Sequence, residues 1–252
     1  GTLWYATAML RAVTLDYWNT LFVDVRGRER ERRRAEVLRA EIGALGYDPP
    51  ASAVDDALRF GFDFFERVWR DEVRTPSCAE ILDAVLGSLR VRAPAEVHAR
   101  LTTAFERVLL DIPPEPVPSL TTTLPALAER YRLAVVCDTG YSPGDVLREL
   151  LDRHCALEPF AYLYFSNEHG MSKPDVRVFK HTLSRLGVPA GEAAHVGDMQ
   201  RTDIAGAQAA GMAAVHFVGA NNRDAARSTA DVMIRHFEEL PAALGGLTCA
   251  GC

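Results

Sequence analysis

Three aspartates in this chain stand beside apolar runs, where carboxylates could bind a metal ion. Asp16 ends an apolar run in "VTLDYWNTLF", Asp198 ends another in "AAHVGDMQRTD", and Asp203 follows at the start of a helical pattern. In an open α/β sheet the carboxyl ends of the strands border one crevice, so we expect Asp16 and Asp198 to meet there. Adjacent carboxylates repel unless a cation lies between them, and hard oxygen ligands suit Mg²⁺. The spacing therefore predicts a magnesium site.

One lysine is placed to reach the same crevice. Lys173, in "MSKPDVRVF", follows a further apolar run and precedes a helical pattern that Pro174 opens. Its ammonium is a compact point charge that suits a phosphate oxygen or a carboxylate. Because the aspartates are nearby, we favour this role over that of a surface lysine.

The elements that must position these residues alternate in the second half of the chain. Apolar runs bounded by turn signals cover residues 11–15, 132–137, 161–165, 193–196 and 213–218, with a weaker run at 232–234. Helical patterns cover 143–153, 175–186 and 203–210. Such alternation predicts an α/β fold with a Rossmann-like parallel sheet and crossover helices.

An all-helical segment interrupts this pattern early in the chain. Its helical patterns cover residues 28–46, 53–73, 77–90 and 94–110, and the proline-rich "DIPPEPVPSL" that follows cannot continue a helix. A capping box, Ser77 with Glu80, opens the third pattern. We predict a discontinuous core of residues 9–23 and 118–244, an α-helical insertion at 24–117, and terminal extensions at 1–8 and 245–252.

Two features of the insertion have ordinary interpretations that we prefer. The run "RGRERERRRAEVLRAE" pairs Glu and Arg at helical spacings, which is typical of a solvated helix face. Phe62, Phe65 and Trp69 share one helical stripe, which is typical of the core of a helix bundle. Phe60 and Phe64 fall on another stripe, so some of these rings could instead face a cleft.

Composition limits the classes of partner. The 252 residues are 48% hydrophobic, enough for a large core in one or two domains. The net charge of −6 and the pI near 5.7 give no global electrostatic reason to expect nucleic acid or an anionic membrane as a partner. No apolar run approaches the roughly 20 residues that cross a bilayer. We predict a cytoplasmic protein that acts on a small anionic molecule.

The cysteines do not predict a disulfide scaffold. They number five, an odd count scattered along the chain, and reduced thiols are the simpler interpretation. The tail "CAGC" holds Cys249 and Cys252, which we interpret as part of a frayed terminus rather than a metal or redox site. The sequence specifies no oligomeric state.

The order of the motifs resembles the haloacid dehalogenase (HAD) superfamily of hydrolases, most of which are phosphatases. The resemblance rests on DxxxTL after the first strand, the polar turn in "VVCDTGYSPG", Lys-Pro before a helix, and "VGDxxxxDIxGAxxAGM". These motifs span the whole core in the superfamily's order. The helical insertion is similar to the superfamily's helical-bundle cap, which closes over the crevice and contacts the substrate.

The resemblance implies covalent phosphoryl transfer with Mg²⁺ as cofactor. It makes Asp16 the nucleophile, forming an aspartyl-phosphate, and makes Lys173 the group that neutralises charge beside it. The metal site it implies consists of Asp16, the backbone carbonyl of Trp18, Asp198 and Asp203, the last as a ligand or as support for one. The phosphate site it implies draws on Lys173 and on Asn19, Cys137, Asp138 and Thr139.

Trp18 departs from the superfamily's pattern. Phosphatases of the superfamily have a second aspartate there, which protonates the leaving alcohol and later activates water. An indole N–H does not titrate in the usable range, and general acid–base catalysis typically contributes about 10²–10⁴-fold. At the second strand the usual Ser or Thr aligns with Cys137, a weak donor. Asp138 must point away from a phosphate, and Thr139 could supply the hydroxyl if the turn is shifted.

Three functions compete for this pattern. We favour a Mg²⁺-dependent phosphomonoesterase that uses a good leaving group or borrows an acid such as Glu168 or His169. A second class is a hydrolase without phosphoester chemistry. Carbon–halogen cleavage needs no proton but also no metal, and phosphonate cleavage uses a cap lysine, which residues 24–117 lack. The third is a weakened or inactive module that keeps the phosphate and metal crevice, with Trp18 filling space against the cap.

The insertion offers arginines and aromatic rings for substrate contact. Arg26 lies close to the predicted hinge, and Arg70 and Arg74 flank an apolar stripe. We therefore predict a phosphorylated or anionic small molecule with an apolar or aromatic body.

Overall fold

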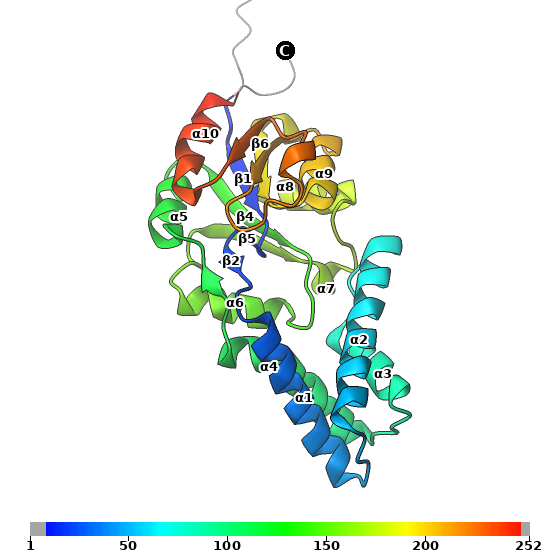
Figure 1. Cartoon of the computed structure of the whole chain (residues 1–252). Coiled ribbons are helices and arrows are strands. Elements are labelled where there is room, and N and C mark those ends of the chain that lie inside the picture. Colours follow the sequence, from blue (N-terminus) through cyan, green and yellow to red (C-terminus); the bar gives the residue numbers. More distant parts are fainter. Residues whose placement is uncertain (1–8, 248–252) are drawn as a thin grey trace, which may run out of the picture.

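A parallel sheet forms the centre of the larger lobe (Figure 1). The computed structural model describes residues 9–247. The sheet has the strand order β5-β4-β1-β6-β7-β8, and every neighbouring pair is parallel. The strands are β1 (Ala12–Leu15), β4 (Arg132–Cys137), β5 (Phe160–Phe165), β6 (Ala193–Gly197), β7 (Ala213–Phe217) and β8 (Val232–Ile234). The predicted α/β class with a Rossmann-like sheet is confirmed.

Strand β1 lies at the point where the strand order reverses. It pairs with β4 on one side and with β6 on the other, so Leu15 lies between Val135 and Val196. In open α/β sheets this switch point opens a crevice at the carboxyl ends of the strands. The residues that follow β1 and β6 therefore meet at one edge.

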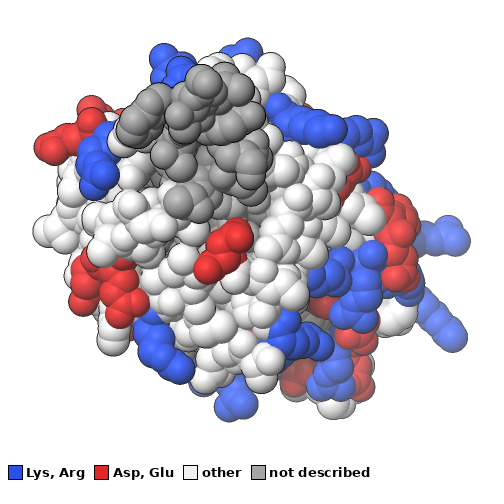
Figure 2. Space-filling view, turned by 90° about the horizontal axis from the view of Figure 1, so that it is seen from above, with Lys and Arg blue, Asp and Glu red and all other residues white. Residues whose placement is uncertain are grey.

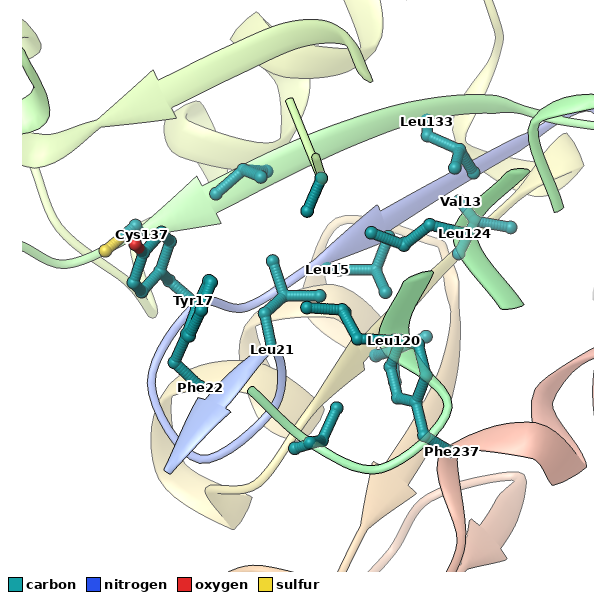
Figure 3. Packing of buried hydrophobic residues seen from close by; sticks show 14 of the residues in the cluster. Val13, Leu15, Tyr17, Leu21, Phe22, Leu120, Leu124, Leu133, Cys137 and Phe237 are labelled. Atoms are coloured by element: carbon teal, nitrogen blue, oxygen red, sulfur yellow. The ribbon is translucent and has the colours of Figure 1, made fainter. Parts of the chain in front are cut away.

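Both faces of the sheet are covered by helices, as its apolar strands require. On one face Val13, Leu15 and Leu133 pack with Leu124 and Phe237 (Figure 3). On the other face Ala12, Ala134 and Val136 pack against Phe179 and Leu183. The covering helices are α5 (Leu120–Ala128), α6 (Gly144–Arg153) and α10 (Leu240–Gly246) on the first face and α8 (Val176–Leu186) and α9 (Ala205–Ala209) on the second.

The smaller lobe is the helical insertion. It contains α1 (Gly27–Ala44), α2 (Ala51–Asp71), α3 (Cys78–Ser88) and α4 (Ala95–Asp111), and the Ser77–Glu80 capping box is present at α3. A core of its own includes Leu38, Leu82 and Phe105. The domain limits at 23/24 and 117/118 stay a prediction.

The two chain crossings between the lobes pair with each other. Strands β2 (Phe22–Val23) and β3 (Glu115–Pro116) form a short antiparallel ladder with Phe22 opposite Pro116. Neither strand was predicted, because two-residue strands show no periodicity. The ladder ties the two connections together at the hinge.

One interpretation of the insertion holds only in part, and another is wrong. Glu31, Arg32 and Arg33 are exposed, as a solvated helix face requires. Arg30 and Arg34 are only 3% and 7% exposed, although their run indicated a solvated helix face. They are four residues apart, so they share one face of α1, and that face packs inward. None of the five aromatic rings of α2 belongs to the buried core of the insertion, and Phe62 is 49% exposed. Helix α2 instead buries the face that carries Val54 and Gly61.

Some elements differ from the patterns or were not predicted. The helix expected at 203–210 begins as a π-helical segment, η2 (Gln200–Ile204), before α9. The helices α5, α7 (Ser166–His169) and α10 were not predicted. The short helices η1 (Ala190–Glu192), η3 (Ala225–Arg227) and η4 (Phe237–Glu239) complete the fold.

The surface opposite the helical lobe mixes both signs of charge rather than gathering one (Figure 2). Among the described residues, no helix has both the length and the apolar character needed to cross a membrane. Cys249 and Cys252 lie outside the described residues, as does the predicted extension 1–8.

Candidate active site

Four charged side chains converge where β1 and β6 end. The Lys173 ammonium donates to Asp16 Oδ1 at 2.5 Å and to Asp203 Oδ1 at 2.7 Å. Asp16, Asp198 and Asp203 each offer one carboxylate oxygen within 4.8 Å of the others. All four side chains are buried. One cation among three carboxylates leaves negative charge in excess, and buried charge is costly unless it is balanced. Three hard oxygen donors fit Mg²⁺.

The turn after β1 brings two of these groups together. The backbone N–H of Asp16 donates to the carbonyl of Val196 at 2.8 Å, which fixes the end of β1 beside β6. Asn19 has φ of 55°, a left-handed conformation that asparagine tolerates better than most residues. Its amide acts to lower the pKa of Asp198 and so opposes the effect of burial on that carboxyl. Asn19 therefore brings the turn after β1 close to Asp198, which follows β6.

Asp203 is held by donors of this chain on both oxygens. Its Oδ2 accepts from the backbone N–H of Met199 at 3.0 Å and from the Thr202 hydroxyl at 3.2 Å. Its Oδ1 accepts from Lys173 and lies 3.2 Å from His195 Nε2. Sequence reasoning missed His195, which in turn contacts the Thr14 hydroxyl at 2.7 Å. A histidine inside an otherwise apolar central strand was the available signal.

Asp198 has fewer fixed contacts. Asn221, on the loop after β7, donates to its Oδ2 at 2.7 Å. His216 contacts its backbone carbonyl at 2.9 Å. Neither residue was predicted, because the loop after β7 carries no pattern that points back to β6.

The pKa values follow from burial and from the lysine. Burial raises the pKa of Asp198 to about 6, and the Asp203 carboxylate adds to this rise. Burial would also raise the pKa of Asp203, but Lys173 and His195 hold it well below its usual value. Burial alone lowers the pKa of Lys173, yet Asp16 and Asp203 outweigh it and raise that pKa well above the usual value. Lys173 is therefore a permanent cation in this crevice.

Cys137 at the end of β4 and the two residues that follow it have different surroundings. Cys137 packs in the apolar core beside Tyr17 (Figure 3), and burial raises the pKa of its thiol. The Asp138 carboxylate accepts from the Trp69 indole N–H at 2.8 Å and from the backbone N–H of Lys173 at 3.0 Å. Thr139 is buried, and its hydroxyl lies 3.1 Å from that of Ser166. Their roles toward phosphate stay a prediction.

The Trp18 ring packs against the hydrophobic core of the sheet. It is partly buried, and its ring meets Tyr17 edge to face at 5.3 Å between centroids. The proposed substitutes for the missing acid both have other partners. Both terminal nitrogens of Arg148 donate hydrogen bonds to the Glu168 carboxylate, at 2.5 and 2.9 Å. His169 stacks on Tyr164 at 4.4 Å.

The segment after α2 touches the core next to the lysine. The backbone N–H of Ser172 donates to the carbonyl of Val73 at 3.0 Å, and the Thr75 and Ser166 hydroxyls lie 2.5 Å apart. The Trp69 ring, already bonded to Asp138, also lies 4.4 Å below the guanidinium of Arg201. These contacts hold the helical lobe closed over this side of the crevice.

The three arginines predicted to meet substrate all have carboxylate partners. Arg26 pairs with Glu29 at 2.6 Å, and Arg70 pairs with Glu66 at 3.0 Å. Arg74 bridges Glu72 and Glu80 at 2.9 and 3.0 Å. None of them stands as an uncompensated charge, and their contact with substrate stays a prediction.

Known proteins resemble this chain in sequence and in fold. A family model described as haloacid dehalogenase-like hydrolase matches residues 64–217, which include Lys173, Asp198 and Asp203. A phosphoserine phosphatase from Thermus thermophilus is 40% identical over 90 residues, 36% of this chain and 36% of that protein. The match thus spans about a third of this relative's length.

Two further similarities cover nearly the whole chain. The N-acylneuraminate-9-phosphatase of Mus musculus is 26% identical over 251 residues, 95% of this chain and 96% of that protein. The crystal structure of a 2-haloacid dehalogenase from Pseudomonas syringae has a TM-score of 0.72 at 24% identity. It covers 94% of this chain and 99% of that one, and at this identity the likeness shows the fold alone.

Proposed function

Because this chain belongs to the haloacid dehalogenase-like hydrolases, we propose that it is a Mg²⁺-dependent phosphomonoesterase in which Asp16 attacks the phosphorus of its substrate. The observation that carries the proposal is the buried cluster itself, in which Lys173 joins Asp16 to Asp203 while Asp198 lies alongside. The phosphatase relatives support the reaction class.

Asp16 is suited to nucleophilic attack in this setting. Its Oδ1 is fixed by the Lys173 ammonium, which orients the carboxylate at the open end of β1. Attack by Asp16 would form an aspartyl-phosphate as the bond between phosphorus and the ester oxygen breaks and the alcohol leaves; water would then release phosphate and restore Asp16. The lysine would balance the charge that accumulates on the phosphoryl oxygens. Asn19 and the Thr139 hydroxyl would supply hydrogen bonds to the phosphate, whereas Cys137 is buried in the core and the Asp138 carboxylate cannot donate.

The metal would be held by Asp16, Asp198 and the backbone carbonyl of Trp18. Asp203 is the better candidate for support than for direct ligation, because donors of the protein already engage both of its oxygens. When bound, Mg²⁺ would supply charge neutralisation to the phosphoryl group.

Trp18 favours substrates whose leaving group needs little protonation. The indole offers no titrating proton, and Glu168 is committed to Arg148. The enzyme should therefore prefer aryl phosphates or other esters of acidic alcohols over simple alkyl phosphates.

The test is the turnover of 4-nitrophenyl phosphate with Mg²⁺ and with excess chelator. We expect hydrolysis with Mg²⁺, loss of activity on chelation, and loss of activity in Asp16→Asn. Asp152→Asn, an exposed aspartate on α6, is the matched control and should keep full activity. If the folded protein hydrolyses no aryl phosphate, the proposal fails.

Carbon–halogen cleavage is the second candidate, and Trp18 is the observation in its favour because a departing halide needs no proton. Chloride release from 2-chloropropionate without metal measures it directly. We expect none, because Asp198 adds a third carboxylate beside Asp16 that a metal-free reaction does not need. Metal-independent chloride release would favour this function over the phosphatase.

A further inference from the structure

A second polar space lies in the helical lobe, where Tyr141 is the residue of the core that reaches it. It is a cavity of about 750 Å³ bordered by α1 and α2 and by Tyr141, which follows Thr139 by two residues. Leu58 and Phe62 give it an apolar wall, and five arginines against three acidic residues line it. Its size and lining are those of a site for a small organic molecule with an anionic group.

Arg34 is the unusual residue of this cavity. Its side chain is buried, and no carboxylate among residues 9–247 approaches its guanidinium to ion-pair distance. Its neighbour Arg30, equally buried, is paired with Asp24. The exposed Arg33 on the same helix has Glu36 as a partner at 3.3 Å. Arg34 alone among these carries a buried charge that the described protein does not balance.

The contacts of Arg34 leave part of its guanidinium available. Nε and Nη2 both point to the carbonyl of Phe105 at 3.4 Å, which is long for such bonds. The guanidinium lies 4.2 Å above the Tyr141 ring. Nη1 has no hydrogen-bond partner among the described residues, and Arg34 is one of the residues that line the cavity. Burial lowers the pKa of Arg34, as expected for a cation without a counterion.

A buried cation is costly unless a partner balances it, and guanidinium is shaped to bind a carboxylate with two hydrogen bonds. We propose that Arg34 binds a carboxylate of the substrate, so that the substrate is a phosphomonoester carrying a second, carboxylic anion. The organic body between the two anions packs against Tyr141 and Phe62. This inference rests on the proposed function for the phosphoester end.

The test compares ligands that differ only in the carboxylate. Binding of 3- and 4-(phosphonomethyl)benzoate and of benzylphosphonate is measured by calorimetry on the full chain with Mg²⁺. Turnover of 3- and 4-carboxyphenyl phosphate and of phenyl phosphate is measured alongside. The wild type should bind at least one carboxylated phosphonate about tenfold to a hundredfold more tightly than benzylphosphonate, the effect of a charge-assisted hydrogen bond.

Variants assign the effect to Arg34. Arg34→Met should abolish this preference while leaving benzylphosphonate binding unchanged, and Arg34→Lys should restore part of it. Arg33→Met, exposed on the same helix, is the matched control and should keep the full preference. Equal loss for both kinds of ligand in Arg34→Met would show a structural role and overturn the inference.

The outcomes separate this inference from the proposed function. If the wild type prefers a carboxylated phosphonate but hydrolyses none of the esters, the phosphatase proposal fails and the Arg34 site stands. If the wild type binds all three phosphonates equally, the Arg34 inference fails even where aryl phosphates are hydrolysed. Should Arg34→Met not fold, the wild-type preference and Arg34→Lys decide the matter.

Discussion

At the scale of single residues, the chemistry open to this protein depends on the side chains around Asp16. Lys173 fixes one carboxylate oxygen, and Asn19 links the same turn to Asp198. Trp18, two residues after Asp16, packs on Tyr17 and contributes no titrating group. Under the proposed function, the charged cluster would supply the groups for phosphoryl transfer, and proton delivery to the leaving group would be the missing part.

Restoring an acid at position 18 should widen the substrate range. In Trp18→Asp we expect the ratio of 2-phenylethyl phosphate to 4-nitrophenyl phosphate turnover to rise by roughly 10²-fold or more, because only the alkyl leaving group needs a proton. Trp18→Phe keeps an aromatic ring without an acid and should leave this ratio unchanged. A folded Trp18→Asp with the wild-type ratio would contradict the explanation.

At the scale of elements, the carboxyl end of β6 depends on a close approach that only glycine permits. A Cβ built on Gly197 would lie 2.4 Å from Asp203 Cγ. The π-helical segment Gln200–Ile204 then returns the Asp203 side chain under β6, where Met199 and Lys173 hold it. The end of β6, Gly197 and the π-helical segment together position Asp203, and Asp203 in turn holds the Lys173 ammonium.

Gly197→Ala should disturb this support. We expect the free energy of unfolding, measured with denaturant, to fall by about 1–3 kcal/mol, as in other overpacked interiors, and phosphatase activity to fall with it. Gly87→Ala is the matched control, since a Cβ there meets nothing within 4 Å. It lies in α3 and should stabilise the protein by about 0.5–1 kcal/mol. Gly197→Ala with unchanged stability and activity would rule out the close contact.

At the scale of the whole molecule, a helical lobe adjoins the lobe that holds the sheet (Figure 1), and α2 contacts the turn after β4 beside Lys173. The β2–β3 ladder joins them at the hinge. On the far side Trp69 connects α2 to Asp138, whose other oxygen accepts from the backbone of Lys173. Closure of the helical lobe and placement of the lysine are therefore coupled through one carboxylate.

Trp69→Phe keeps an aromatic ring on Phe65 but removes the N–H that Asp138 accepts. A hydrogen bond to a charged group contributes about 1.5–3 kcal/mol, so we expect roughly tenfold faster amide exchange in residues 72–77 and a lower kcat/KM. Asp63→Asn, an exposed change on α2, is the matched control and should leave both unchanged. Wild-type exchange rates in Trp69→Phe would show that this bond does not hold the lobe closed.

The sequence alone determined the alternating core and the order of its motifs, because apolar periodicity and turn residues are local properties of the chain. It also indicated the helical insertion, whose caps and proline-rich exit are local signals. Asp16, Lys173, Asp198 and Asp203 were recognisable for the same reason, since each follows a recognisable run. Their roles toward substrate and metal stay proposals.

Tertiary structure alone decided which side chains face inward. The run of charges on α1 indicated a solvated face, yet Arg30 and Arg34 are buried because the packing of α1 against the rest of the protein turns that face inward. The aromatic stripe of α2 indicated a core, yet Val54 and Gly61 form its buried face. His195, Asn221 and Trp69 reach the site only through folding, because contacts between distant segments leave no periodic signal in the chain.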